Sequence, residues 1–310
     1  MSAMPGATKN GLRDVAIVAG HELGESLRSR RVLILALLFV GGAVAGTLAF
    51  VELLESVEAS LAQALAVAEP GKPGAVTAAL MQSPEFLRIL GRLVRDDALA
   101  RELAGLPPLA LFYGWLGLTF MPVLVMLTAA ETISSELGSG SARFSLLRTA
   151  RLSFSLGKLA GQTLLLAIGI AGGALAVWVT GYAALGSFEA GRSALWLGLL
   201  SIRIGVYAFA HIGLAVGLSH LTRSVPLSRA LALGSLLLLG ALWGIGRHND
   251  AVREHAPGFA DTLLAIVPRS HMLDLWQPTL VDRLPALVVL PALGVVYFAL
   301  GYNYRARRDA

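Results

Sequence analysis

The sequence contains no cysteine among its 310 residues. This absence excludes a disulfide framework, a thiolate nucleophile and any metal site that depends on cysteine ligands. The six histidines are scattered, and none of them stands at a spacing typical of metal ligands. His21 precedes Glu22, but no second histidine completes the motif H-E-x-x-H. The sequence therefore predicts no metal and no cofactor on this chain.

Charge is scarce as well. Only 15% of the residues are charged, whereas a soluble domain carries about 25%. Apolar residues make up 55%, and the mean hydropathy is +0.69. The deficit comes from long stretches that are nearly free of charge, which is typical of a chain partly surrounded by lipid. The net charge of +5 therefore raises the question of membrane sidedness, and we expect no nucleic-acid partner.

A phosphate-binding loop of the form G-x-x-x-x-G-K-[ST] is also missing. The pairs Gly71-Lys72 and Gly157-Lys158 lack both the upstream glycine and the following hydroxyl residue. The run from Gly138 to Ser141 alternates glycine and serine as a nucleophile turn does, but it lies in a charged connection outside the apolar runs. We expect a chain that is not an enzyme on its own.

Six apolar stretches are long enough to cross a bilayer core, which takes about 20 residues of helix. They are twice the length of barrel strands and do not alternate, so helices are predicted. The predicted spans are Val32–Phe50, Pro108–Ala130, Leu159–Leu185, Leu195–Leu218, Leu227–Ile245 and Leu284–Tyr302. The fold class is therefore an all-α polytopic membrane protein, with residues 32–310 as one six-helix domain after a polar segment, 1–31. The first span is too long for a signal peptide and is expected to stay as an anchor.

The charges that flank the spans predict the orientation. Segments 1–31, 131–158, 219–229 and 303–310 carry 14 Lys and Arg against 6 Asp and Glu. Segments 51–107, 186–194 and 246–283 carry 10 against 14. Because basic residues accumulate on the cytoplasmic side, both termini are predicted to be cytoplasmic.

Three segments outside the spans have patterns of their own. Residues Leu12–Arg30 place Leu12, Ala16, Ala19, Leu23 and Leu27 on one stripe, with Glu22 mostly off it, which predicts an amphipathic helix along the cytoplasmic interface. Segment 51–107 has a break at Pro70–Gly74 and a helix start at Ser83-Pro84-Glu85, which predicts an extracytoplasmic helical hairpin. Segment 246–283 holds apolar stretches too short to span, such as Thr262–Val267, which could enter the outer leaflet.

Glycine pairs and polar residues within the spans complete the pattern. Four small-xxx-small pairs, Gly42/Gly46, Gly169/Gly173, Gly213/Gly217 and Gly240/Gly244, favour close helix packing in lipid. Arg203 is a charge well inside a span, and His211 follows two helical turns later. The two side chains could line a polar pathway, or Arg203 could extend toward the outer interface.

The inner segment 131–158 reads as a helix end, a glycine-serine turn, a short helix and a basic return to the membrane. Ser141 could cap a short helix over Ala142–Thr149. Phe144, Leu146 and Leu147 are apolar although they lie in a cytoplasmic connection, so a protein partner or the membrane surface should cover them.

This arrangement resembles the type-2 ABC exporter permeases. Glu131 and Glu136 match the acidic positions of the family pattern, Gly140-Ser141 the Gly-[ST] step, Leu146-Leu147 the leucine pair, and Gly157-Lys158 the return to the membrane. Thr149–Ser153 departs from the expected Pro-x-Ser-Arg stretch. Three further parts of the sequence also match the family pattern: Glu22-Leu23 with the segment Leu27–Arg31, the inner loop Leu218–Ser224, and the basic end Tyr304–Asp309. Within the family, the sequence is most similar to the branch of the nitrous-oxide-reductase maturation permease.

The resemblance implies a permease subunit of a bacterial inner-membrane exporter. Two permease copies, identical or different, would bind two separate ATPase subunits that hold ATP and Mg²⁺. Residues 141–149 would form the coupling helix, and the resemblance assigns the ATPase contact to Glu136, Gly140, Ser141, Arg143, Leu146, Leu147 and Arg148. Two alternatives remain open. One is a membrane anchor or assembly factor that couples an ATPase to an outer protein without bulk transport, and the other is an intramembrane enzyme. The transported substrate is not predicted.

Overall fold

The structure is a computed structural model that describes residues 7–64, 84, 87–88, 91–92, 97–185, 188–277 and 279–308. In these residues all regular structure is helical, and six helices are long and apolar enough to cross a membrane, as predicted. They are α2 (Arg30–Ala64), α6 (Pro108–Ala129), α9 (Arg151–Ala184), α10 (Ala190–Ser219), α11 (Val225–His248) and α14 (Leu280–Arg308). The all-α polytopic fold class is therefore confirmed.

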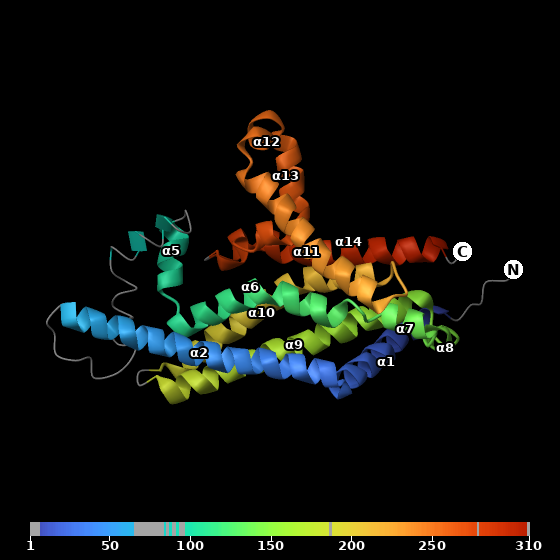
Figure 1. The fold of residues 1–310 in the computed structure, drawn as a ribbon, viewed down its shortest axis with the longest axis horizontal. Coiled ribbons are helices and arrows are strands. Elements are labelled where there is room, and N and C mark those ends of the chain that lie inside the picture. Colours follow the sequence, from blue (N-terminus) through green and yellow to red (C-terminus); the bar gives the residue numbers. More distant parts are fainter. Residues whose placement is uncertain are drawn as a thin grey trace.

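Helices α6 and α10 form the centre of the bundle, and α2 and α11 lie at its edges. The core between α6, α9 and α10 contains Tyr113, whose hydroxyl donates a hydrogen bond to the Ile170 carbonyl at 2.9 Å. The same hydroxyl lies 3.2 Å from the Ser201 hydroxyl. Helices α2, α6, α9, α10 and α14 run along the length of the bundle, and α1 lies at the same end of it as the last turns of α14 (Figure 1). Helix α9, with 34 residues, is about 50 Å long and exceeds the roughly 30 Å bilayer core.

Glycine allows α10 and α14 to pack backbone against backbone. A Cβ atom at Gly213 would overlap the Gly294 backbone, and one at Gly301 would overlap the Gly217 backbone. The predicted pair Gly213/Gly217 is thus a true close approach. Gly46 and Gly173 pack against the rings of Phe112 and Phe39. By contrast, Gly42, Gly169 and the pair Gly240/Gly244 have open space around them in this chain.

Helix α1 (Ala7–Arg28) packs against the first turns of α9. Gly157 and Gly161 of α9 leave no room for a side chain, because a Cβ there would overlap Val18 and Glu22 respectively. The packed face of α1 contains Val15, Val18, Ala19, Glu22 and Ser26. This face is displaced from the predicted apolar stripe and shares only Ala19 with it. Among the other residues of the stripe, Leu23 is half-buried, and Leu12, Ala16 and Leu27 are exposed. A lipid-facing role for the stripe stays a prediction.

Most of the predicted outer hairpin, including Pro70–Gly74, Ser83 and Glu85, lies outside the described residues. Its last part is helix α5 (Asp97–Ala104), which places Leu99 and Leu103 in the core of the bundle. Arg192 of α10 donates a hydrogen bond to the Gly105 carbonyl at 2.6 Å. The end of segment 51–107 is therefore packed on the end of the spans that is predicted to be extracytoplasmic.

The second outer segment is helical too. It contains α12 (Asp250–His255), α13 (Pro257–Ile266) and the short 3₁₀ helices η1 (Pro268–His271) and η2 (Asp274–Trp276). Helices α11 and α13 leave the bundle together as an arm, and η1 lies where the arm rejoins it (Figure 1). There the Tyr297 hydroxyl of α14 donates a hydrogen bond to the Ile266 carbonyl. The segment packs against the bundle as expected, and its depth in a membrane stays a prediction.

Candidate functional site

The loop between α6 and α9 has a defined shape. It contains α7 (Ser134–Ser139) and α8 (Ala142–Leu146), joined by a sharp turn at Gly140. Gly140 has φ = 80°, in the left-handed region that glycine enters without strain. A Cβ at Gly138 would overlap the Arg223 carbonyl, so α7 touches the backbone of the neighbouring inner loop. Both glycines are therefore needed where they stand.

A buried ion-pair network fastens this loop to α1 and α9. The Lys158 ammonium, with a side chain only 3% exposed, pairs with the carboxylates of both Glu136 and Glu22. Gln162, one turn later on α9, donates a hydrogen bond to the second Glu22 oxygen at 2.7 Å. Because a buried charge without a partner is costly, this lysine makes the positions of three helices interdependent.

The same cluster does not have the character of a metal site. The carboxylates of Glu22, Glu25 and Glu136 approach one another within 4.8 Å. However, the Lys158 ammonium already pairs with two of them, and the third, Glu25, is exposed and lies 3.8 Å from His21. The arrangement therefore resembles an ion-pair cluster whose charges are compensated by Lys158.

Glu131 organises a second network at the start of the loop. Its carboxylate accepts hydrogen bonds from Arg31, at the start of α2, and from Arg229, the fifth residue of α11. The Arg229 Nε lies 2.9 Å from the carboxylate oxygen. Arg31 also donates to the Leu127 carbonyl at the end of α6. A single carboxylate thus joins the ends of three spans, α2, α6 and α11, on the side of the bundle where α1 lies.

Neutral contacts fix the inner end of α10 to the same loop. The Ser219 hydroxyl accepts hydrogen bonds from the backbone N–H groups of Ile133 and Ser134, at 3.0 and 2.9 Å. His220 Nε2 lies 3.1 Å from the Ser155 hydroxyl of α9. Burial lowers the pKa of His220 to about 4, so its ring is neutral near pH 7. The loop is held by four spans and by α1.

The opposite side of the loop is uncovered. Phe144 and Leu147 are 75% and 82% exposed, and Arg143 and Arg148 beside them are exposed as well. We name these four residues the docking surface. Two large apolar side chains on a polar connection, flanked by cations, are typical of a surface that a protein partner covers.

The predicted contact residues divide between the two sides. Arg143, Leu147 and Arg148 belong to the docking surface, and Ser141 is exposed next to it. Glu136 faces Lys158, whereas Leu146 is half-buried over a small cavity that Phe154 and Tyr302 also line. Glu22 belongs to the buried network, and Leu23 and Leu27 do not. Phe144 was absent from the predicted contacts, although an apolar side chain in a connection that is predicted to be cytoplasmic is a signal for it.

Two predictions about this loop were wrong. The Ser141 side chain does not cap α8, because Ser141 has helical backbone angles and its hydroxyl lies 3.0 Å from the Ser139 hydroxyl. Helix α8 also ends at Leu146 and not at Thr149, with turns continuing to Thr149. The tight turn at Gly140 starts the helix without the extended residue that a serine cap needs.

Arg203 and His211 occupy different surroundings, although both are buried in α10. The Arg203 guanidinium lies over the Trp196 ring at 5.9 Å and near the charges of Glu102 and Arg283, toward the outer end. His211 lines a cavity between α6, α10, α11 and η1, which Arg203 does not line. A single polar pathway through both residues stays a prediction.

Together, the six apolar helices indicate a multi-pass membrane protein, and the loop between α6 and α9 exposes an apolar and basic surface at one end of it. The family model "ABC-2 family transporter protein" matches residues 16–309. The chain therefore belongs to this family of transport permeases, as the resemblance implied, and is a permease subunit of an ABC transporter. Members of the family are generally non-catalytic transport subunits. No curated protein matches the chain.

Proposed function

We propose that the chain is the permease of an exporter whose energy comes from separate ATPase subunits bound to the docking surface. The observation that carries the proposal is the contrast within one short loop. Phe144 and Leu147 are uncovered on one side, while Glu136 on the other side is tied to the buried Lys158. A loop that is rigidly held and yet presents apolar groups suits the transfer of force from a partner.

The contacts suggest how such force would spread. A push on α8 would act on α7 through the Gly140 turn and then on α1 and α9 through Lys158. The same push would reach α2 and α11 through Glu131. A displacement at the docking surface would in this way reorient several spans together, as alternating access requires.

The proposal places ATP and Mg²⁺ on the partner, because the chain carries no phosphate loop. In it, two ATPase subunits serve two permease copies in the bacterial inner membrane, with both termini in the cytoplasm. The basic excess beside the inner ends of the spans supports this orientation. The branch of the nitrous-oxide-reductase maturation permease stays a further expectation.

Disruption of the docking surface tests the proposal. The double variant Leu147→Asp with Arg148→Glu should bind the ATPase subunits at least about tenfold more weakly, because an apolar anchor and a cation are both lost. ATPase stimulation by the permease should fall in parallel. The measurement is ATP hydrolysis by the reconstituted complex, together with co-purification of the subunits.

A matched control is Leu147→Met with Arg148→Lys, which keeps an apolar group and a positive charge. This variant should retain most of the stimulation. If the disruptive variant inserts normally and still stimulates the ATPase fully, the docking surface is assigned wrongly. Uptake into inside-out vesicles then separates an exporter from an assembly factor, since only an exporter would move a substrate on ATP addition.

A further inference from the structure

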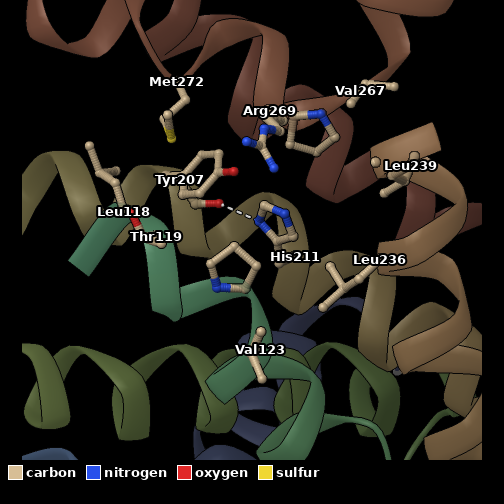
Figure 2. A pocket seen from close by; sticks show the side chains of 13 residues that line it. Leu118, Thr119, Val123, Tyr207, His211, Leu236, Leu239, Val267, Arg269 and Met272 are labelled. Atoms are coloured by element: carbon tan, nitrogen blue, oxygen red, sulfur yellow. Dashed lines mark hydrogen bonds between the residues drawn. The ribbon is translucent and has the colours of Figure 1, made fainter. Parts of the chain in front are cut away.

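The cavity beside His211 has features that the docking loop does not use. It measures about 200 Å³ and lies between α6, α10, α11 and η1. Its walls are largely apolar, with Leu118 and Val123 on one side and Leu236 and Leu239 on another (Figure 2). Leu118 lies near the middle of α6, so the cavity is far from both ends of that span.

One cation, Arg269 of η1, points into this apolar space (Figure 2). The guanidinium lies 4.4 Å from the centre of the Trp243 ring and close enough to Tyr207 to act on it electrostatically. In the part of the chain that the structure describes, no carboxylate oxygen forms an ion pair with Arg269. Arg269 is exposed in this structure, so its guanidinium is accessible to a ligand that enters the cavity.

Two buried polar groups face the same space. Tyr207 and His211 are each 3% exposed, yet within the described residues neither the Tyr207 hydroxyl nor His211 Nε2 has a hydrogen-bond partner. His211 Nδ1 lies 3.0 Å from the Tyr207 carbonyl and must donate to it, which leaves Nε2 as an acceptor in the neutral ring. Both atoms are accessible from the cavity, because among the described residues only Thr132 Oγ1 is an enclosed side-chain atom without a hydrogen-bond partner. They lie on the side of the cavity where the Arg269 guanidinium points (Figure 2).

We propose that this cavity binds the acidic head group of an amphiphile, such as a phosphate monoester on an acyl or alkyl chain. Arg269 would pair with the anionic oxygens, and the Tyr207 hydroxyl would donate a hydrogen bond to them. His211 Nε2 would accept a hydrogen bond from an O–H of the head group. The first carbons of the chain would lie along Leu118, Leu236 and Leu239.

The size of the cavity supports this ligand class. A volume of 200 Å³ equals that of about seven liquid waters, which suits a head group and the start of one chain. The remainder of the acyl or alkyl chain would lie in the lipid beside α11, in which only Ser228, Ala232 and Gly246 are buried. That such an amphiphile is also the exported substrate rests on the proposed permease function, whereas its binding does not.

Binding can be measured on the full chain without any ATPase. The chain is placed in phosphatidylcholine nanodiscs, and radiolabelled dodecyl phosphate is titrated with and without excess unlabelled compound. Wild type should show saturable binding, and Arg269→Gln should weaken it at least about tenfold because a charge-assisted contact is lost. Dodecylphosphocholine, which has the same chain but no net charge, should compete poorly.

Filling the cavity gives a second and independent test. Gly240 lines the cavity, and a Cβ there meets no atom within 4 Å, so Gly240→Leu should fold and block the site. Gly244→Leu is the matched control, because Gly244 has equal free space but does not line the cavity. Arg247→Gln is the control for the loss of a positive charge in Arg269→Gln, because Arg247 is an exposed residue of α11 that does not line the cavity.

Each result has a definite meaning. The proposal is supported if Arg269→Gln and Gly240→Leu lose binding while Arg247→Gln and Gly244→Leu keep it. It is overturned if Arg269→Gln binds as wild type, if Arg247→Gln loses as much, or if inorganic phosphate competes as well as dodecyl phosphate. If the chain binds dodecyl phosphate but the compound does not change ATP hydrolysis by the complex, the binding site is supported. The same result counts against the proposal that such an amphiphile is the exported substrate.

Discussion

At the scale of single residues, Lys158 shows how a charge can be kept inside the protein. Its ammonium is shared by Glu22 and Glu136, and Gln162 takes up the remaining Glu22 oxygen. Glu22 and Lys158 are 136 positions apart in the sequence. Removal of one partner from such a buried group leaves the others without compensation.

Replacing Lys158 by methionine should therefore destabilise the chain by about 3–5 kcal/mol, because two buried carboxylates lose their counter-ion. The measurement is the thermal unfolding midpoint of the purified chain in detergent. The triple variant Lys158→Met, Glu22→Gln, Glu136→Gln should recover part of the loss. Arg151→Met, which removes an exposed cation of the same helix, should change the midpoint little. Equal midpoints for Lys158→Met and wild type would contradict the role of the network.

Single residues were only partly predictable from the sequence. The acidic pattern drew attention to Glu131 and Glu136, but the cations that face them belong to distant helices that the sequence does not bring together. Arg269 was missed because it lies in an outer segment, and only the return of η1 to the bundle places it beside His211. The Ser141 cap failed because the neighbouring Gly140 already makes the turn.

At the scale of elements, the close packing of α10 and α14 is the tightest feature of the bundle. The backbones of Gly213 and Gly217 meet those of Gly294, Tyr297 and Phe298 directly. No side chain separates the helices there, so the contact depends on glycine.

Substitution of Gly217 by valine should thus force the two helices apart and cost about 1–3 kcal/mol or more. Gly205→Val in the same helix is the control, since a Cβ at Gly205 has free space. The expected readout is a lower unfolding midpoint and more aggregate in size-exclusion chromatography for Gly217→Val alone. If both variants behave alike, helix propensity and not packing determines the effect.

The six spans were predicted well because hydropathy over about 20 residues depends on lipid and hardly on neighbours. The glycine pairs were predicted less well. Gly213/Gly217 and Gly240/Gly244 have identical spacing, yet only the first pair meets another helix in this chain. Spacing shows that a close approach is possible, and the topology decides whether a helix is there to make it.

At the scale of the whole molecule, the orientation in the membrane is the central expectation. The absence of cysteine makes it easy to test, because an introduced cysteine is the only thiol on the chain. Ser141 and Ala251 are exposed and belong to segments predicted on opposite sides.

A membrane-impermeant maleimide should label Ala251→Cys in intact cells, because α12 is expected outside. Ser141→Cys should be labelled only after the membrane is opened. Comparison of labelling before and after permeabilisation is the measurement. Labelling of Ser141→Cys in intact cells would reverse the orientation and remove the docking surface from the reach of a cytoplasmic ATPase.

The short link between α1 and α2 has a mechanical consequence. At Ser29 the chain passes from one helix to the next within a residue, and hydrogen bonds from Ser29 N–H to Ser26 and from Leu33 N–H to Ser29 keep the joint stiff. Helix α2 lies at the edge of the bundle, where few of its side chains are buried. A tilt of α1 will therefore rotate α2 about Ser29, and the largest displacement will occur at the end of α2 that is farthest from Ser29.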